Sequence, residues 1–270
     1  MLEPGFLQIE GVRLEARWTG PPPEEAPTLV FLHEGLGSTS LWRDFPDRLI
    51  RETGWGALVY SRAGYGKSDP VPLPRPVRFM HDEAEALPKV LAAAGIRDHV
   101  LIGHSDGASI SLIHAGLIHA GLIHAGSHPG PGLRGLILEA PHVFTEPHGL
   151  ASIARMREIY RDTDLRERLA RHHGANVDVA FRGWNDVWLD PEFAAWNIEE
   201  YLPAIRVPIL ILQGEDDEYG TWAQVEAIER QSGGPVESIA IPRCGHSPHR
   251  EQPDAALQAM REFVSRLRYE

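Results

Sequence analysis

Several short apolar runs, each rich in leucine or β-branched residues, limit the fold of this chain more than any other feature. They span residues 28–35, 56–66, 99–107, 135–142, 207–217 and 237–246. The runs are continuous rather than alternating, which indicates strands covered on both faces, as in a parallel sheet. Helical patterns separate them, so the sequence predicts a doubly wound α/β fold with helices on both faces of the sheet.

Two regions depart from this alternation. Residues 6–18 alternate apolar and polar side chains around Gly11, which predicts two antiparallel strands ahead of a mostly parallel sheet of the eight-stranded type. Residues 142–206 show no strand pattern and are rich in helical and aromatic sequence. We interpret this stretch as a helical cap (a lid) inserted into a core made of residues 1–141 and 207–270.

Composition limits the partners of the protein. The chain has 270 residues and a formal net charge of −12, which disfavours nucleic acid and anionic membranes. The single cysteine, Cys244, excludes an intrachain disulfide. The first residues lack a secretory signal pattern, and no apolar run approaches the roughly 20 residues of a membrane span. We therefore expect a cytoplasmic protein that acts on a small molecule.

The pentapeptide Gly-His-Ser-Asp-Gly at 103–107 follows one apolar run and precedes a predicted helix. It matches the Gly-x-Ser-x-Gly turn, in which side chains in place of the glycines would collide with neighbouring backbone. Such a turn exposes the hydroxyl of Ser105 as a nucleophile and directs the backbone N–H of Asp106 toward a developing oxyanion. The pattern alone is also compatible with an ordinary glycine-rich turn.

A serine nucleophile requires a base and an acid that orients the base. Among the 14 histidines, His246 is the best placed, because it follows the last apolar run; His33 and His249 are its competitors. The candidate acids form the cluster at 215–218, directly after Gly214. The carboxyl ends of strands are where open α/β sheets build their sites.

These motifs resemble those of the α/β-hydrolase fold, and the resemblance covers essentially the whole chain. The stretches "LHEGLGSTSLW" and "SRAGYGKSD" resemble two further loops of the family. The resemblance implies a serine hydrolase whose triad is Ser105, Asp217 and His246, in the chain order expected of this fold. It also implies that the backbone N–H of Gly35 is the second oxyanion donor, and that no metal and no organic cofactor is needed.

One residue departs from the family pattern. The loop reads His33-Glu34-Gly35, where the family usually has glycine directly after the histidine. A carboxylate beside an oxyanion hole opposes the oxyanion unless it is neutral or turned away. Glu34 therefore either contacts the substrate or is hydrogen-bonded into its loop. The predicted substrate pocket consists of Glu34, Leu36, His104, Trp184 and Trp188.

The triad predicts hydrolysis of a small carboxylic ester or thioester through an acyl-serine. The same groups serve hydrolysis of a carbon–carbon bond or of an N-terminal proline amide, which are alternatives within the fold. An alternative of another class is a ligand receptor that keeps the hydrolase fold with negligible turnover.

Residues 112–126 contain Leu-Ile-His-Ala-Gly three times in succession, within the helix expected after Ser105. A five-residue period turns each copy by about 140° around a helix, so the leucine–isoleucine pairs cannot share one face. We predict either a lengthened helix that packs against the cap or a second copy of the chain, forming a homodimer, or a helix that breaks at a glycine. The three histidines point in different directions, which argues against a metal site.

Overall fold

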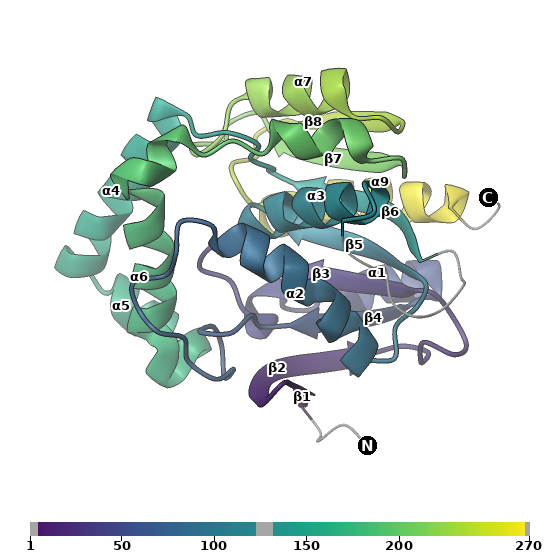
Figure 1. The fold of residues 1–270 in the computed structure, drawn as a ribbon, viewed down its shortest axis with the longest axis horizontal. Helices are drawn as coiled ribbons and strands as arrows, with labels where there is room; N and C mark the ends of the chain where they lie inside the picture. Colours follow the sequence, from purple (N-terminus) through teal and green to yellow (C-terminus); the bar gives the residue numbers. More distant parts are fainter. Residues whose placement is uncertain (1–4, 123–131, 268–270) are drawn as a thin grey trace.

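An eight-stranded sheet forms the centre of the computed structural model, which describes residues 5–122 and 132–267 (Figure 1). The strand order is β1-β2-β4-β3-β5-β6-β7-β8. The pairs β1–β2 and β2–β4 are antiparallel, and the other neighbouring pairs are parallel, which confirms the prediction. The strands are β1 (Phe6–Ile9), β2 (Val12–Thr19), β3 (Thr28–Leu32), β4 (Gly56–Tyr60), β5 (His99–His104), β6 (Leu133–Glu139), β7 (Ile209–Gly214) and β8 (Val236–Ile241).

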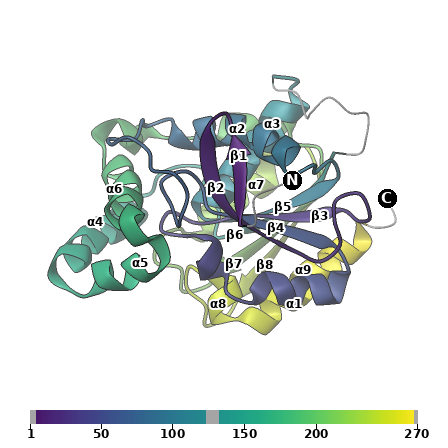
Figure 2. The same ribbon diagram turned by 90° about the horizontal axis from the view of Figure 1, so that it is seen from below.

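Helices cover both faces of the sheet, as predicted. Figure 2 shows α2, α3 and α7 on one face and α1, α8 and α9 on the other. The described helices are α1 (Phe45–Thr53), α2 (Phe79–Ala93), α3 (Asp106–His119), α4 (Pro147–Asp162), α5 (Leu165–His173), α6 (Val177–Trp188), α7 (Trp222–Gln231), α8 (Pro248–Glu251) and α9 (Pro253–Arg266). Short 3-10 turns are η1 (Thr39–Trp42), η2 (Gly174–Asn176), η3 (Pro191–Ala195) and η4 (Glu199–Ala204). None of the described helices has the length and apolar character needed to cross a lipid bilayer.

The pleat of the central strands divides the core into two layers. Along β3, Leu29 and Phe31 pack in the layer of α1 and α9. Val30 and Leu32 pack in the layer of α2 and α3. Successive side chains of a strand point to opposite faces, so a strand that is apolar at every position fits only between two layers of helices.

Between β6 and β7, the segment 142–206 forms helices and an isolated bridge from Phe144 to Asn197. Helices α4, α5 and α6 stand together at one end of the sheet (Figure 1). They share a cavity with the loops that follow β3 and β5. The later turn η4 instead packs beside α3, where Tyr201 meets Gly116. The segment therefore has two parts with different neighbours.

The repeat is only partly helical within the described residues. Helix α3 continues to His119, and Gly121 then adopts φ +71°. The chain thus leaves the helix at Gly121 and not at Gly116. The first copy is buried, with His114 Nδ1 2.9 Å from the carbonyl oxygen of Ala84 on α2 and Gly116 against Tyr201 on η4, whereas Leu122 is 70% exposed. The remainder of the third copy, at 123–126, lies outside the described residues. The contact of the helix with a second chain stays a prediction.

Gly116 and Gly121 occupy the same position in successive copies but have different surroundings. A Cβ at Gly116 would lie 2.6 Å from the Cβ of Tyr201, whereas a Cβ at Gly121 would meet no atom of the described residues within 4 Å. We expect Gly116→Ala to lower the free energy of unfolding by about 1–3 kcal/mol through overpacking. Gly121→Asn, which tolerates a left-handed backbone, should cost less than about 1 kcal/mol. Urea denaturation measures both losses, and equal losses would contradict this packing.

Candidate active site

Ser105 lies on the turn between β5 and α3. Its backbone has φ +53° and ψ −116°, a region that residues other than glycine rarely adopt. A Cβ at Gly103 would lie 2.4 Å from the carbonyl oxygen of Gly107, and a Cβ at Gly107 would lie 2.1 Å from that of Leu32. Glycine is therefore required at both positions. The turn presents Ser105 to a pocket.

His246 and Asp217 face each other across the loops that follow β8 and β7. The Nδ1 atom of His246 lies 2.9 Å from both carboxylate oxygens of Asp217. The backbone N–H of Tyr219 donates to the same carboxylate at 2.8 Å. Burial would raise the pKa of Asp217, but the His246 ring and the Tyr219 N–H hold that pKa well below its usual value. Asp217 is therefore ionised and oriented toward His246.

Direct backbone contact joins the two loops that carry Asp217 and His246. A Cβ at Gly214 would lie 2.1 Å from the carbonyl oxygen of Gly245, so only glycine fits between them. Of the four acids at 215–218, Asp217 is the one that contacts His246, and its side chain is 1% exposed. The family resemblance implies the same residue.

A buried arginine holds the loop His33-Glu34-Gly35. Arg62 donates from Nη2 to the carbonyl oxygens of His33 and Glu34, at 3.3 and 3.0 Å. Burial and the guanidinium of Arg62 lower the pKa of His33. The ring of His33 accepts at Nε2 from the backbone N–H of Arg62. A Cβ at Gly35 would lie 2.0 Å from the indole ring of Trp184. Glycine at this position therefore allows α6 to pack directly on the loop.

Glu34 pairs with the histidine that precedes Ser105. Its Oε2 atom lies 3.5 Å from Nδ1 of His104, and Nε2 of His104 donates to the carbonyl oxygen of His246 at 2.6 Å. Burial would lower the pKa of His104, but Glu34 raises it to about 8. Burial would raise the pKa of Glu34, but His104 holds it well below its usual range. A positive charge thus balances the carboxylate that departs from the family pattern.

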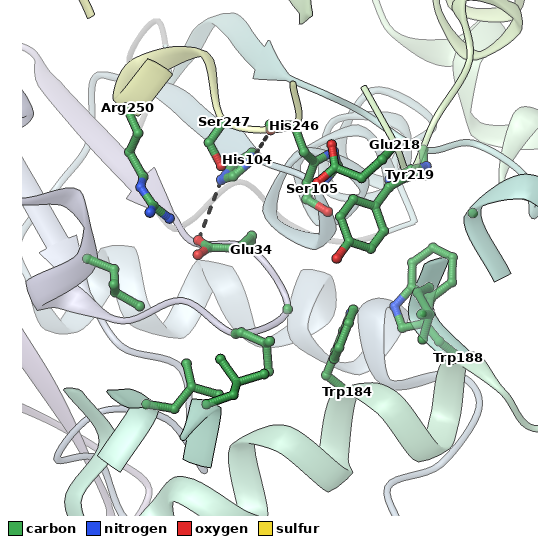
Figure 3. A pocket seen from close by; sticks show the side chains of 18 of the residues that line it. Glu34, His104, Ser105, Trp184, Trp188, Glu218, Tyr219, His246, Ser247 and Arg250 are labelled. Carbon is green, nitrogen blue, oxygen red and sulfur yellow. Dashed lines mark hydrogen bonds and ion pairs between the residues drawn. The ribbon is translucent and has the colours of Figure 1, made fainter. Parts of the chain in front are cut away.

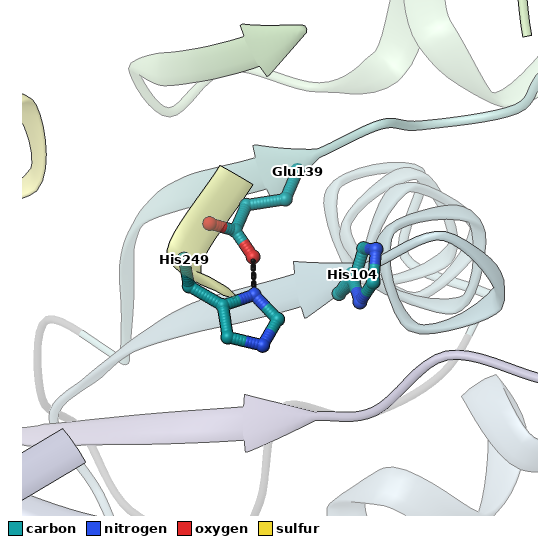
Figure 4. Close-up of side chains that lie close together, drawn as sticks. All are labelled: His104, Glu139 and His249. Atoms are coloured by element: carbon teal, nitrogen blue, oxygen red, sulfur yellow. Dashed lines mark hydrogen bonds and ion pairs between the residues drawn. The ribbon is translucent and has the colours of Figure 1, made fainter. Parts of the chain in front are cut away.

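His104 also belongs to a group of three buried side chains, with Glu139 and His249 (Figure 4). One ligand atom of each lies within 4.8 Å of the others, which raises the question of a metal ion. Nδ1 of His249 lies 2.6 Å from Oε2 of Glu139, closer than the roughly 3 Å between two ligands of one ion. We assign this contact as a hydrogen bond. His249 therefore pairs with Glu139, and His246 is the histidine that faces the pocket of Ser105.

Ser105, His246 and Glu34 border one pocket of about 590 Å³ (Figure 3). This volume suits a small molecule. Trp188 is held at the pocket wall by Asp106, whose Oδ1 atom accepts from its indole N–H at 3.1 Å. Trp196 instead stacks on Phe193, with ring centroids 5.2 Å apart. The predicted residues that border the pocket are Glu34, Gly35, Leu36, His104, Ser105, Trp184, Trp188 and His246.

Sequence reasoning missed several residues of the pocket, which include Arg43, His142, His172, Tyr219 and Arg250. The rings of His142 and Tyr219 lie 5.6 and 4.7 Å from that of His246. Both residues follow strands that the sequence analysis had located, so their position after a strand was a usable signal. The other three come from separate segments, and no local pattern connects them.

The sequence profile of the alpha/beta hydrolase family matches residues 29–259. The chain belongs to this family. A curated relative from Enterobacter sp. (strain 638), a 2-succinyl-6-hydroxy-2,4-cyclohexadiene-1-carboxylate synthase, is 27% identical over 278 residues. The match covers 90% of this chain and 93% of the relative. The family resemblance of the sequence motifs is therefore confirmed.

Solved hydrolase structures share the fold. A thermophilic esterase from Thermogutta terrifontis, determined with malate bound, has a TM-score of 0.72 and 19% identity, covering 97% of this chain and 98% of its own. An esterase from Exiguobacterium antarcticum has a TM-score of 0.70 and 20% identity, covering 96% and 98%. At these identities the likeness establishes the fold and leaves the substrate to be argued from the site.

The pair of His104 and Glu34 makes stability depend on pH. The pKa of His104 is about 8 in the fold, against 6.5 for an ordinary histidine. A raised pKa contributes stability that is fully present below about pH 6.5 and is lost as the pH rises through about 8. We expect the stability advantage of the wild type over His104→Gln to fall by on the order of 2 kcal/mol between about pH 6 and about pH 9. Urea denaturation at both pH values measures it, and a constant advantage would contradict the ionised pair.

Proposed function

We propose that this protein is a serine hydrolase that cleaves a small carboxylic ester or thioester. Ser105 is the nucleophile, His246 the base and Asp217 the acid that orients the base. The observation that carries the proposal is Nδ1 of His246 at 2.9 Å from both oxygens of Asp217, in the pocket that Ser105 borders. Membership in the alpha/beta hydrolase family supports this chemistry.

The ionised Asp217 sets the tautomer of His246. A carboxylate can only accept hydrogen bonds, so Nδ1 of His246 carries a proton and Nε2 is an acceptor. In the proposed reaction, Nε2 takes the proton of Ser105 while Oγ attacks the carbonyl carbon of the substrate. The imidazolium then protonates the leaving alcohol or thiol. The same ring activates the water that releases the acid from the acyl-serine.

Two backbone N–H groups, those of Asp106 and Gly35, are the proposed donors to the oxyanion. The strained turn at Ser105 carries the first, and Arg62 holds the loop of the second. One such donor is typically worth about 3 kcal/mol of transition-state stabilisation. The positive charge of His104 offsets the negative charge of Glu34, so the carboxylate does not oppose the developing negative charge.

Helices α4, α5 and α6 are the proposed cap over Ser105. Their apolar contribution to the pocket consists of Trp184 and Trp188, with Leu150, Ile153, Leu165 and Leu169. Trp184 packs on the loop of Gly35, and Trp188 donates to Asp106. The cap is thus attached to both segments that carry the proposed oxyanion donors. Its aromatic wall favours a substrate with an apolar portion.

A second candidate activity comes from the two curated relatives, both described as 2-succinyl-6-hydroxy-2,4-cyclohexadiene-1-carboxylate synthase. It is favoured by coverage of 90% and 88% of this chain at 27% and 25% identity. The same pocket and the same serine would serve that reaction. Formation of the named compound by the purified protein, with Ser105→Ala as control, tests it.

Replacing the proposed nucleophile or acid should abolish most ester turnover. We expect Ser105→Ala to lower kcat toward p-nitrophenyl esters at least about 10³-fold, and Asp217→Asn about 10⁴-fold by removing the required tautomer of His246. A serine-directed fluorophosphonate should label the wild type and not Ser105→Ala. Steady-state kinetics over an acyl-chain series and intact-protein mass spectrometry measure these effects.

Ser265→Ala is the matched control, because this exposed serine on α9 donates only to its own helix, at the carbonyl of Glu262. It should keep wild-type turnover and labelling. Labelling without ester turnover would favour the proline amide or carbon–carbon alternatives. If the wild type neither hydrolyses any ester nor reacts with the fluorophosphonate, the hydrolase proposal is wrong and the receptor alternative is favoured.

A further inference from the structure

One side of the pocket is basic. Arg43, His172 and Arg250 border the pocket, and we refer to these three residues as the basic rim. Figure 3 shows Arg250 on the other side of Glu34 from Trp184. The proposed hydrolysis uses none of the three rim residues, so their presence needs a separate explanation.

Packing beneath the rim brings together the segments that carry its two arginines. Arg43 follows Trp42 and Arg250 follows His249, and the rings of Trp42 and His249 lie 4.5 Å apart in the interior. Arg43 has φ +52° and ψ −128°, a backbone conformation that residues other than glycine rarely adopt. Such strain persists only where the surrounding structure enforces it, and it is concentrated at functional sites.

His172 reaches the rim from the last turn of α5. Its Nδ1 atom lies 2.9 Å from Oγ of Ser40, which fixes the ring. Burial lowers the pKa of His172, and the guanidinium groups of Arg250 and Arg43 lower it further, so the ring is neutral. With Ser40 as the donor to Nδ1, the proton of the ring is on Nε2, which can donate to a ligand.

The two arginines of the rim have no carboxylate partner within the described part of the chain. Among the residues that the structure describes, neither Arg43 nor Arg250 forms an ion pair with a carboxylate. Four glutamates border the same pocket, and three have other partners: Glu251 accepts from two backbone N–H groups at 2.7 and 3.0 Å, Glu146 accepts from Thr221 and Gln224, and Glu34 faces His104. The fourth, Glu218, is exposed. Like charges held near one another repel, and a bound anion offsets this repulsion.

We propose that the basic rim binds a carboxylate of the substrate, so that the ester or thioester cleaved at Ser105 is itself an acid. This inference rests on the proposed hydrolase function. A guanidinium presents parallel N–H groups that match the two oxygens of a carboxylate, and Nε2 of His172 supplies one more donor. A dianionic phosphate fits less well, because it places two charges at the rim, and Glu251, next in sequence to Arg250, borders the same pocket and would repel the second charge.

The two sides of the pocket then define the substrate class. Trp184 and Trp188 contact an apolar portion, and the basic rim binds the carboxylate. Half-esters of dicarboxylic acids carry the charge on the acyl side of the scissile bond. Esters of hydroxy acids carry it on the alcohol side.

Matched pairs of esters test the inference. p-Nitrophenyl half-esters of dicarboxylic acids are compared with monocarboxylic esters of equal length, and 4-acetoxybenzoate with its methyl ester. We expect kcat/KM of the acidic member to exceed that of the neutral member by at least about tenfold in one of the two sets. Arg43→Gln and Arg250→Gln should each lower this acidic-to-neutral ratio about tenfold, mainly through KM, and added salt should lower it too.

Arg261→Gln is the matched control, because this exposed arginine on α9 pairs with Glu52 at 3.8 Å and does not border the pocket. It should leave the acidic-to-neutral ratio unchanged. If the wild type hydrolyses neutral esters through Ser105 but prefers the acidic member in neither set, the inference about the rim is wrong and the hydrolase proposal stands.

Binding to Ser105→Ala provides a readout that does not depend on turnover. We expect adipate to bind this variant in a calorimetric titration, about tenfold more weakly when Arg250→Gln is added, and inorganic phosphate to bind less tightly than adipate. The absence of adipate binding, binding unaffected by Arg250→Gln, or tighter binding of phosphate would overturn the carboxylate assignment. Rim-dependent adipate binding without any hydrolysis that requires Ser105 would overturn the hydrolase proposal instead.

Discussion

Strands buried on both faces leave the loops at their carboxyl ends as the place where polar side chains can meet in this fold. The buried strands β5 and β7 lead into the loops of Ser105 and Asp217, and the partly exposed edge strand β8 leads into the loop of His246. The turn of Ser105 packs against the end of β3, and the loops of Asp217 and His246 pack against each other, only because glycine removes the side chain at both contacts. Gly107 passes against Leu32, and Gly214 passes against Gly245. The geometry of the site therefore depends on the burial of the sheet and on a few positions where a Cβ cannot be accommodated.

Ionisable side chains beneath the serine are arranged in pairs. His104 carries a charge because Glu34 raises its pKa, and it also holds the carbonyl of His246. Glu139 accepts from the neighbouring His249. A buried charge is costly unless it is paired and hydrogen-bonded. These pairs make an acidic side chain tolerable beside a site where negative charge is proposed to develop, and they connect the turn of Ser105 to the loop of the proposed base.

Much of the fold was predictable because its signals are local. A continuous apolar run needs two covering layers, and the turn at Ser105 needs glycine on both sides, so the runs and the motif could be interpreted without coordinates. The acid was harder to assign from the residues alone, since Asp217 is one of four consecutive acids, and the docking of its loop against Gly245 brings it to His246. The repeat illustrates the limit. Gly116 and Gly121 are equivalent in sequence, yet Tyr201 packs on the first of them only.

The sequence by itself determined the α/β architecture and the strained turn of Ser105, because both follow from residues that are neighbours along the chain. Only the tertiary structure decided that Glu34 is paired with His104 and that Arg43, His172 and Arg250 border one pocket. Those contacts join segments that are remote in sequence. They depend on packing such as that of Trp42 against His249, for which no local pattern exists. The substrate class proposed for this protein therefore rests on tertiary contacts, whereas its proposed reaction was already suggested by the motif.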